Sequence, residues 1–579
     1  SKMATPAKKF INQPDDIVEE MVQGMAATCR GLARVGKQHV LVRSDYASVN
    51  QSQVMIISGG GSGHEPAHAG FCGDGMISGA VLGGVFASPG ANAVESAIKA
   101  IAGPPGCLLI VKNYTGDRLN FGIALEKAKG SGIPCEMVVV GDDCALPKDK
   151  GITGRRGVAG TVFVHKVAGA AAKAGKTLKE VADAARKAAE AVGSMGIALN
   201  TCTLPGQPQN DRLDDKTIEI GLGIHGEPGA HQSPLLPCDT LVDTAVAAIL
   251  DPAKGGDELP YLQAAKGAEV ALLVNSLGSA SPMELALIGR RAISNIEGRG
   301  LKVVRLLSGG YLTSLDMAGF SLSIMNLDAD LKSALDVPTT APAWGVLHDL
   351  SSSSPAVIAE PVLDATAAAA AGSGCADADL GKRIKAACEA LIKSEPDLTA
   401  WDEVCGDGDC GTTMKRGAQR VLDDLSTYPT DPSQCMGCVA DSVNNSMGGT
   451  SGALLQIFFR AVSTSLAQSG STEAGSKRKR EDIEAAAFQA GVDAMMFYGR
   501  GQKGFRTMLD ALIPAAAAFT DGKGLAGAAA AAKEGAEATK TMSASAGRAN
   551  WVNEDAYKGT PDPGAMAVAY VLEACAKDP

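Results

Sequence analysis

Short apolar runs that end in polar or glycine-rich loops recur through the first 330 residues and then almost vanish, which restricts the possible folds more than any other feature. Clear examples are residues 54–57, 108–111, 137–140 and 270–274, and alanine-rich stretches of helical character separate them. This alternation predicts an α/β region. Because ligands of such sheets bind beyond the carboxyl ends of the strands, the polar loops after these runs define a candidate site.

The rest of the chain shows helical periodicity. Leu380, Ile384, Cys388 and Leu391 recur at helical spacing, and further alanine-rich amphipathic stretches follow to about residue 571. This pattern predicts an all-α domain. We therefore expect a multidomain protein. Its predicted parts are an α/β region with two subdomains (1–348), a linker rich in serine and alanine (349–376), and an all-helical domain (377–579).

Composition excludes several classes of function. The 53 basic and 64 acidic residues give a net charge of −11, so the chain has no overall positive field for nucleic acid. No apolar run is long enough to cross a membrane. The 14 cysteines are scattered without regular spacing, as is typical of reduced thiols. We expect a cytoplasmic protein, or an organellar one if a transit peptide has been removed.

Histidines and a carboxylate stand in loops of the α/β region. His64 follows the glycine-rich segment 58–63, and His225 lies in a second glycine-containing loop, 221–229. Asp117 follows another apolar run. Together these residues offer two imidazoles and a carboxylate for proton transfer or nucleophilic attack. A metal site on His64 and His68 is a weaker alternative, because Pro66 disfavours the helix that would align them.

Aspartates are concentrated in the helical domain. Asp402, Asp407 and Asp409 lie within eight positions, and the glycines among them disfavour a regular helix. Hard oxygen ligands, with no histidine after residue 348, favour Mg²⁺ over zinc. An EF-hand calcium loop fails, since its twelfth position would be Ala418. The small-residue segment 447–452 precedes an apolar helix and could bind phosphate, so the pattern indicates a nucleotide.

Three short motifs are interpreted as ordinary structure. The G-x-G-x-x-G pattern at 221–226 is followed by prolines where a dinucleotide-binding helix should begin. The Gly-Lys-Thr at 175–177 follows a helical stretch instead of a strand and loop. The lone C-x-x-C at 435–438 has no second cysteine pair or nearby histidine.

Several longer motifs together resemble the dihydroxyacetone kinases of the single-chain, ATP-dependent type, also called triokinases or glycerone kinases. They are SGGGSGHEPAHAGF at 58–71, VKNYTGDRLNF at 111–121, GLGIHGEPG at 221–229, GDGDCGTT at 406–413, MGGTSG at 447–452, RTMLD at 506–510 and PDPGA at 561–565. The resemblance covers nearly the whole chain. It implies an α/β substrate-binding region followed by a helical-barrel domain that binds Mg-ATP.

The resemblance also implies roles for individual residues. His225 would hold dihydroxyacetone as a covalent hemiaminal, while His64 and Asp117 would act as acid and base at the hydroxyl to be phosphorylated. Substrate-binding residues would be Gly61, Ser62, Gly63, His64, Lys112 and Asp117. The metal ligands would be Asp402, Asp407 and Asp409, holding two Mg²⁺ ions. The nucleotide would contact Cys410, Gly411, Thr412, Thr413, Thr450, Ser451, Gly499, Thr507, Met508, Asp562, Pro563 and Gly564.

The expected activity is ATP-dependent phosphorylation of dihydroxyacetone and of D-glyceraldehyde. The resemblance further suggests a homodimer in which each helical domain serves the partner's substrate site. Two alternatives stay open: an FAD-AMP lyase that forms cyclic riboflavin phosphate at the same nucleotide site, with Mn²⁺ favoured, and a carbonyl-sensing regulator without catalysis. Retention of His225, His64, Asp117 and the metal aspartates argues against the regulator.

Overall fold

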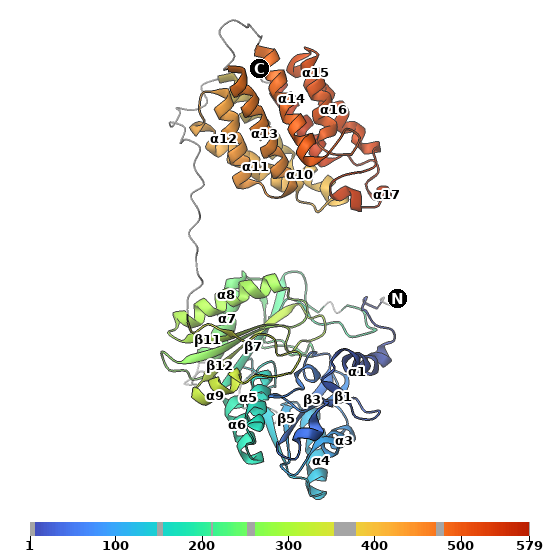
Figure 1. Cartoon of the computed structure of the whole chain (residues 1–579), viewed down its shortest axis with the longest axis vertical. Helices are drawn as coiled ribbons and strands as arrows, with labels where there is room; N and C mark the ends of the chain where they lie inside the picture. The colour runs from blue at the N-terminus through green and yellow to red at the C-terminus, as the bar shows by residue number, and fades with distance from the viewer. Residues whose placement is uncertain are drawn as a thin grey trace. The chain divides into compact units, whose positions relative to one another are not determined.

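The computed structural model of the chain describes residues 6–146, 154–209, 212–251, 261–352, 378–470 and 480–577. Contacts within the chain divide it into two compact units, Ser1–Ile358 and Ala359–Pro579 (Figure 1). The predicted linker lies outside the described residues from residue 353 onward.

The first unit begins with a mixed sheet whose strand order is β1-β2-β4-β3-β5-β6, here called the first sheet. Strands β4, β3, β5 and β6 run parallel to one another, while β2 pairs antiparallel with β4 and β1 pairs antiparallel with β2. The strands are β1 (Leu32–Arg34), β2 (Val40–Arg43), β3 (Met55–Ser62), β4 (Gly79–Val85), β5 (Cys107–Lys112) and β6 (Cys135–Val140). All three apolar runs predicted here are strands of this sheet.

The second sheet of this unit has the order β13-β11-β10-β12-β7-β8-β9 and is mostly antiparallel, with β10 and β11 parallel. Its strands are β7 (Val192–Ala198), β8 (Thr217–Ile220), β9 (His231–Pro234), β10 (Glu269–Ser276), β11 (Lys302–Gly309), β12 (Gly319–Leu327) and β13 (His348–Asp349). The predicted run at 270–274 lies within β10. The α/β prediction is therefore confirmed, with two mixed sheets in place of an all-parallel arrangement.

Helices cover both sheets and also pack between them (Figure 1). Helices α3 and α4 pack on one face of the first sheet, and α7 and α8 pack on one face of the second. A shared core joins the remaining faces through α5 and α6. The helices are α1 (Ile17–Thr28), α2 (Tyr46–Val49), α3 (Ala91–Ile101), α4 (Thr115–Gly130), α5 (Thr161–Lys173), α6 (Leu178–Glu190), α7 (Cys238–Leu250), α8 (Pro282–Gly298) and α9 (Ala329–Asp336).

The described residues of the second unit are helical and contain no strand, which confirms the all-α prediction. Each long helix packs against the next along the chain from α10 to α16, and α18 packs against both α16 and α10, so the helices close into a ring. They are α10 (Ala378–Cys405), α11 (Cys410–Asp424), α12 (Pro432–Ser446), α13 (Gly449–Gly470), α14 (Arg480–Gly499), α15 (Leu509–Thr520), α16 (Gly524–Ala538), α17 (Glu554–Tyr557) and α18 (Pro563–Lys577).

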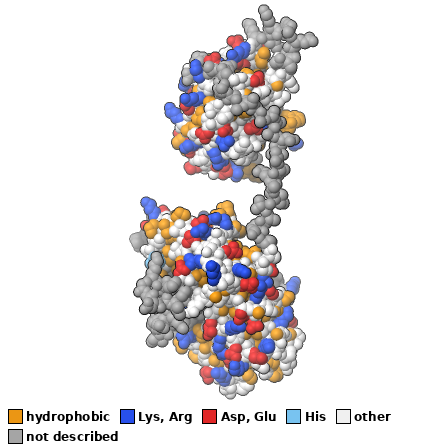
Figure 2. Space-filling model, turned by 90° about the vertical axis from the view of Figure 1, so that its left-hand side faces the viewer, with side chains coloured by type: hydrophobic (Ala, Val, Ile, Leu, Met, Phe, Trp, Pro, Cys, Tyr) orange, Lys and Arg blue, Asp and Glu red, His pale blue; other side chains and the backbone are white. Residues whose placement is uncertain are grey.

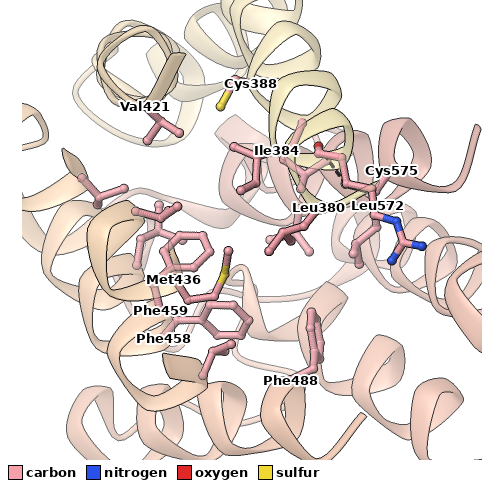
Figure 3. Close-up of a pocket in the computed structure, with 18 of the residues that line it drawn as sticks. Leu380, Ile384, Cys388, Val421, Met436, Phe458, Phe459, Phe488, Leu572 and Cys575 are labelled. Carbon is pink, nitrogen blue, oxygen red and sulfur yellow. Dashed lines mark hydrogen bonds between the residues drawn. The ribbon is translucent and has the colours of Figure 1, made fainter. Parts of the chain in front are cut away.

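The ring of helices surrounds an apolar cavity of about 750 Å³ (Figure 3). Its lining includes Leu380, Ile384, Cys388 and Leu391, so the helical face predicted from their spacing points inward. Phe458 and Phe488 add aromatic rings from α13 and α14. None of the clustered aspartates lines this cavity, and its apolar walls are unsuited to phosphate.

The surface agrees with the charge analysis. On the face shown in Figure 2, blue and red side chains are interspersed over both units instead of gathering into one basic patch. Within the described parts of the chain, no helix combines the length and the apolar character needed to span a membrane.

Candidate functional site

The glycine-rich segment before His64 is part of a strand. The sequence predicts a turn from Ser58 onward, but β3 continues to Ser62, so that expectation was wrong. Added Cβ atoms would lie 2.2 Å from the Val81 carbonyl oxygen at Gly59 and 2.7 Å from the Ala87 nitrogen at Gly61. Glycine is therefore needed for close approach of neighbouring backbone, and β3 carries the chain directly to the sheet edge where His64 stands.

His64 is fully buried, and its Nδ1 lies 2.8 Å from the Thr313 carbonyl oxygen. Because a carbonyl oxygen can only accept, Nδ1 carries the proton and donates it to Thr313. Burial, together with the Lys112 charge and the neighbouring His225, holds the pKa of His64 well below its usual value. The Nε2 of His64 has no partner among the described residues, so it is a neutral acceptor available to a ligand.

His225 lies between β8 and β9, with its ring surrounded by other rings. Ring centroids lie 4.9 Å away at His64, 5.0 Å at Phe86 and 4.8 Å at Tyr114. About a quarter of the His225 side chain is exposed. The two histidines singled out by the sequence are therefore in contact, although they lie 161 positions apart in the chain.

Lys112 and Asp117 complete this side of the site. Lys112 ends β5 and Asp117 lies in the first turn of α4, and both side chains are buried. A Cβ added at Gly60 would be 3.4 Å from Asp117 Oδ2 and 3.6 Å from Lys112 Nζ, so both side chains lie over that glycine. Burial raises the pKa of Asp117, and the Lys112 charge opposes this rise. The other carboxylate oxygen, Oδ1, has no partner in the described chain.

Sequence reasoning missed four residues of this site. Phe86 and Tyr114 form walls around His225, and Thr313 fixes the His64 ring. Glu227 accepts the His225 backbone N–H at 2.8 Å. Tyr114 and Glu227 lie inside recognised motifs, which could have drawn attention to them. No local signal identified Phe86 or Thr313.

His68 does not share a site with His64. Its Nδ1 lies 3.3 Å from Ser58 Oγ, which is also 3.1 Å from His165 Nε2. Ser58 donates its own proton to the Ile110 carbonyl, so both imidazoles donate to its oxygen. Burial lowers the pKa of both rings, which are therefore neutral. His68 therefore belongs to a buried polar group with His165, and the structure gives no support to a metal shared by His64 and His68.

This buried group predicts a measurable pH effect. Burial lowers the pKa of His165 to about 3 in the folded protein, whereas a histidine in the unfolded chain has a pKa of about 6.5. Between these two pH values only the unfolded state binds a proton at His165. The free energy of unfolding therefore falls as the pH drops from about 6.5 towards 3. In His165→Gln, the loss of unfolding free energy between about pH 7 and pH 4.5 should be roughly 3 kcal/mol smaller than in the parent. Urea unfolding followed by circular dichroism at both pH values measures this difference. The exposed His231→Gln should match the parent, and an unchanged loss in His165→Gln would contradict the prediction.

The clustered aspartates converge in the second unit. Ligand oxygens of Asp402, Asp407 and Asp409 all lie within 4.8 Å of one another. The buried Asp402 uses Oδ2 to accept the backbone N–H groups of Asp409 and Cys410, at 2.9 and 3.0 Å, which folds the loop back on α10. Asp407 pairs with Arg548 at 2.9 Å. Three convergent carboxylates with one balancing cation fit the oxygen donor set that Mg²⁺ prefers.

The residues expected to contact the nucleotide all lie at helix ends. Cys410 to Thr413 begin α11, and Thr450 and Ser451 lie in the first turn of α13. Asp562 immediately precedes α18, which begins with Pro563 and Gly564. Gly499 ends α14, and Thr507 and Met508 precede α15. The helix N-termini present backbone N–H groups, which suits an anionic ligand.

Some of these helix ends are demonstrably close together. A Cβ at Gly564 would be 3.5 Å from Met508 Cβ, and one at Gly499 would be 3.0 Å from Leu454 near the start of α13. Asp562 is partly buried, and burial raises its pKa to about 6, with the charges of Arg506, Asp510 and Asp402 also acting on it. The α15 and α18 starts therefore lie beside the aspartate cluster.

Arg506 was not predicted. It is buried, its guanidinium carbon lies 4.4 Å from the Tyr557 ring centroid, and its Nη2 donates to the Thr560 carbonyl at 2.9 Å. Its backbone has φ of 59°, unusual for a residue other than glycine. Arg506 thus ties the segment before α15 to the segment before α18. The motif at 506–510 was recognised, but sequence spacing gave no reason to single out its first residue.

The three motifs set aside have ordinary structures. The pattern at 221–226 leads into β9 instead of a helix. Residues 175–177 connect α5 to α6, where Thr177 caps the second helix. Cys435 and Cys438 both lie within α12. At each motif the secondary structure is the one expected from the sequence.

Comparison with known proteins agrees with the division of the chain into an α/β unit and an all-helical unit. Residues 23–343 match the Dak1 domain family, and residues 404–577 match the DAK2 domain family. A putative 3,4-dihydroxy-2-butanone kinase of Solanum lycopersicum is 44% identical, and the triokinase/FMN cyclase of Homo sapiens is 39% identical, each alignment covering 98% of both chains. The crystal structure of the C. freundii dihydroxyacetone kinase with AMP-PNP and Mg²⁺ is similar with a TM-score of 0.64 and 35% identity, covering 99% of this chain and 100% of that one. The chain therefore belongs to the family of single-chain dihydroxyacetone kinases and triokinases, with a Dak1 and a DAK2 domain.

Proposed function

We propose that this protein uses ATP to phosphorylate dihydroxyacetone, and D-glyceraldehyde as a second substrate, and that His225 holds the substrate as a covalent hemiaminal. The observation that carries the proposal is the contact between His225 and the neutral His64, whose Nε2 has no partner among the described residues, with Asp117 close enough to His225 to interact with it. The related proteins are named as kinases of hydroxylated ketones and trioses. A carbonyl to capture and a hydroxyl to phosphorylate are the groups these side chains fit.

In this proposal His225 attacks the carbonyl carbon, while His64 and Asp117 act as acid and base at the hydroxyl to be phosphorylated. The bare Nε2 of His64 can accept that proton, since its ring is neutral at ordinary pH. Asp117 can accept the same hydroxyl through Oδ1. Lys112 adds a positive charge beside Asp117 and favours its ionised form.

Asp402, Asp407 and Asp409 would hold two Mg²⁺ ions, and the helix ends around them would hold ATP. When bound, Mg²⁺ neutralises the phosphate charge and ATP supplies the phosphoryl group. The oxygen donors and the N–H groups at the starts of α11, α13 and α18 support this assignment. Thr450 and Ser451 would add hydroxyl donors at the start of α13.

Covalent capture predicts strong discrimination against glycerol. Glycerol has the hydroxyls of dihydroxyacetone but no carbonyl for His225 to attack, so its kcat/KM should be at least about 100-fold lower. ADP release with Mg-ATP, measured with each substrate in turn, tests this. Glycerol turnover within about threefold of the ketone would contradict the covalent role of His225.

We also propose a homodimer in which the helical domain of one protomer serves the substrate site of its partner. A mixture of His225→Ala and Asp402→Asn chains tests this arrangement. In a mixed dimer the intact substrate site of one protomer meets the intact helical domain of the other, so activity should return to about a quarter of the parent value after subunit exchange. No recovery from demonstrably mixed dimers would contradict transfer between protomers.

A second activity is supported by the names of the mammalian relatives, which include FMN cyclase. FAD carries the same adenosine diphosphate element as ATP and would use the same aspartates, with Mn²⁺ as the preferred ion. Production of cyclic riboflavin phosphate from FAD with Mn²⁺ measures this activity. A purely regulatory role is less favoured, since such a protein would not need the aspartate cluster.

We place the protein in the cytoplasm. All cysteines in the described residues are free thiols, which supports a reducing compartment.

A further inference from the structure

A chain of charged side chains leads from His225 to the buried Arg156 and Asp143, and the roles assigned so far do not use it. Glu227 Oε2 accepts the His225 backbone N–H at 2.8 Å, and Glu227 Oε1 lies 3.7 Å from His225 Nδ1. The same Oε1 lies 3.5 Å from Arg156 Nη1. One carboxylate thus faces both the backbone and the ring of the histidine.

Arg156 is itself fixed on two further sides. Its Nε donates to Asp143 Oδ2 at 2.7 Å, and its Nη2 donates to the Gly221 carbonyl at 2.7 Å. Asp143 is buried, and it also accepts the Ala145 N–H at 2.9 Å. Because each group in this chain has a fixed partner, Arg156 can hold the Glu227 carboxylate in one place.

The backbone of the loop that holds His225 leaves room for the Glu227 side chain at Gly223. A Cβ added at Gly223 would lie 1.9 Å from Glu227 Cδ, so any other residue at position 223 would displace the carboxylate. Although burial raises the pKa of Glu227, its interaction with His225 outweighs burial and lowers that pKa to about 2. Glu227 is therefore an ionised group held against the imidazole by the shape of its loop.

We propose that Glu227 is a positioning residue for His225: its carboxylate receives the Nδ1–H of the imidazole, so that the Nε2 lone pair faces the substrate carbonyl. The inference rests on the proposed covalent capture and adds the residue that sets the tautomer of the nucleophile. The present 3.7 Å separation is longer than a hydrogen bond. Catalytic hydrogen bonds often shorten when substrate binds.

The proposed step balances without a further reactant. The Nε2 lone pair forms the N–C bond, and the π electrons of the carbonyl move onto its oxygen. The imidazole becomes positively charged, and Glu227 stabilises that charge across Nδ1–H. The Nδ1 proton then passes by way of the carboxylate to solvent water, and the alkoxide takes one proton from solvent water, which gives a neutral hemiaminal and a neutral ring with no net gain or loss of protons.

The experiment compares Glu227→Gln with Glu219→Gln in the full chain. Glutamine keeps the size of Glu227 and an oxygen for the His225 N–H but loses the negative charge. Glu219 is a matched control, because it is a buried carboxylate that accepts the Gly229 N–H at 2.6 Å and supports the same loop without contacting His225. The probe is dihydroxyacetone labelled with ¹³C at C2, whose signal moves from the carbonyl to the tetrahedral region on capture.

Glu227→Gln should raise the KM for dihydroxyacetone about tenfold or more, with a smaller change in kcat, and should weaken the tetrahedral ¹³C signal in proportion, while Glu219→Gln keeps both near parent values. An intact tetrahedral signal in Glu227→Gln, or equal losses in both variants, would overturn the positioning role. A parent protein that turns over substrate without any tetrahedral signal would instead overturn the covalent capture on which the inference rests.

Discussion

Replacing His225 with alanine is expected to lower kcat/KM for dihydroxyacetone by about three orders of magnitude, equivalent to about 4 kcal/mol of transition-state stabilisation. The change removes the only nucleophile proposed for the carbonyl and opens the space between Tyr114 and Phe86, so the ketone would lose both its anchor and its orientation. Initial rates of ADP release over a range of dihydroxyacetone concentrations measure the effect.

His231→Ala is the matched control for this variant. His231 begins β9, only a few residues further along the same hairpin, but its side chain is exposed and outside the proposed site. Its removal should leave kcat/KM within about twofold of the parent, as is usual for surface substitutions. If His225→Ala also stays within about tenfold of the parent, phosphorylation does not need the covalent intermediate.

Replacing Asp402 with asparagine should lower kcat by about 1000-fold or more. Asp402 has two roles in the structure, since it offers an oxygen to the aspartate cluster and accepts the N–H groups of Asp409 and Cys410. Asparagine keeps one oxygen, which can accept these N–H groups, but it replaces the other oxygen with an amide nitrogen that cannot bind Mg²⁺, and it carries no charge. The metal site would therefore lose a negative charge and one of the two Asp402 oxygens. The rate measured across a Mg²⁺ titration gives the result.

Asp397→Asn controls for the loss of one negative charge, because Asp397 is exposed on the same helix, α10, outside the cluster. It should keep the parent Mg²⁺ dependence. Full activity of Asp402→Asn at saturating Mg²⁺ would mean that the ions are held elsewhere.

The broad fold was predictable because the spacing of apolar residues along one helix or strand shows which of its sides is buried. The apolar run at 108–111 lies in β5, and Leu380, Ile384 and Cys388 lie on the inner face of α10. Each pattern depends only on which side of a single element is buried. The glycine segment was misread, because a close approach of β3 to the backbone around Ala87 cannot be seen from residues 58–63 alone.

The candidate site was predictable only in part. His64, Asp117 and His225 have reactive side chains inside motifs, and the two histidines were found in contact. Thr313 acts through its backbone carbonyl from 249 positions away, and Phe86 contributes an ordinary aromatic ring, so neither has a recognisable local pattern. The role of Arg156 could not be predicted from the sequence either, because it depends on ion pairs with Asp143 and Glu227 from separate loops.

The central proposal is that the first unit captures a ketone and that ATP bound in a second unit, supplied by the partner protomer, phosphorylates it. The most direct measurement quantifies ADP and dihydroxyacetone phosphate together after incubation of the parent, His225→Ala and Asp402→Asn proteins with Mg-ATP and dihydroxyacetone. The account predicts equal amounts of both products from the parent, dependent on ketone and Mg²⁺, and almost none from either variant. No ketone-dependent product from folded, Mg²⁺-loaded parent protein would contradict it.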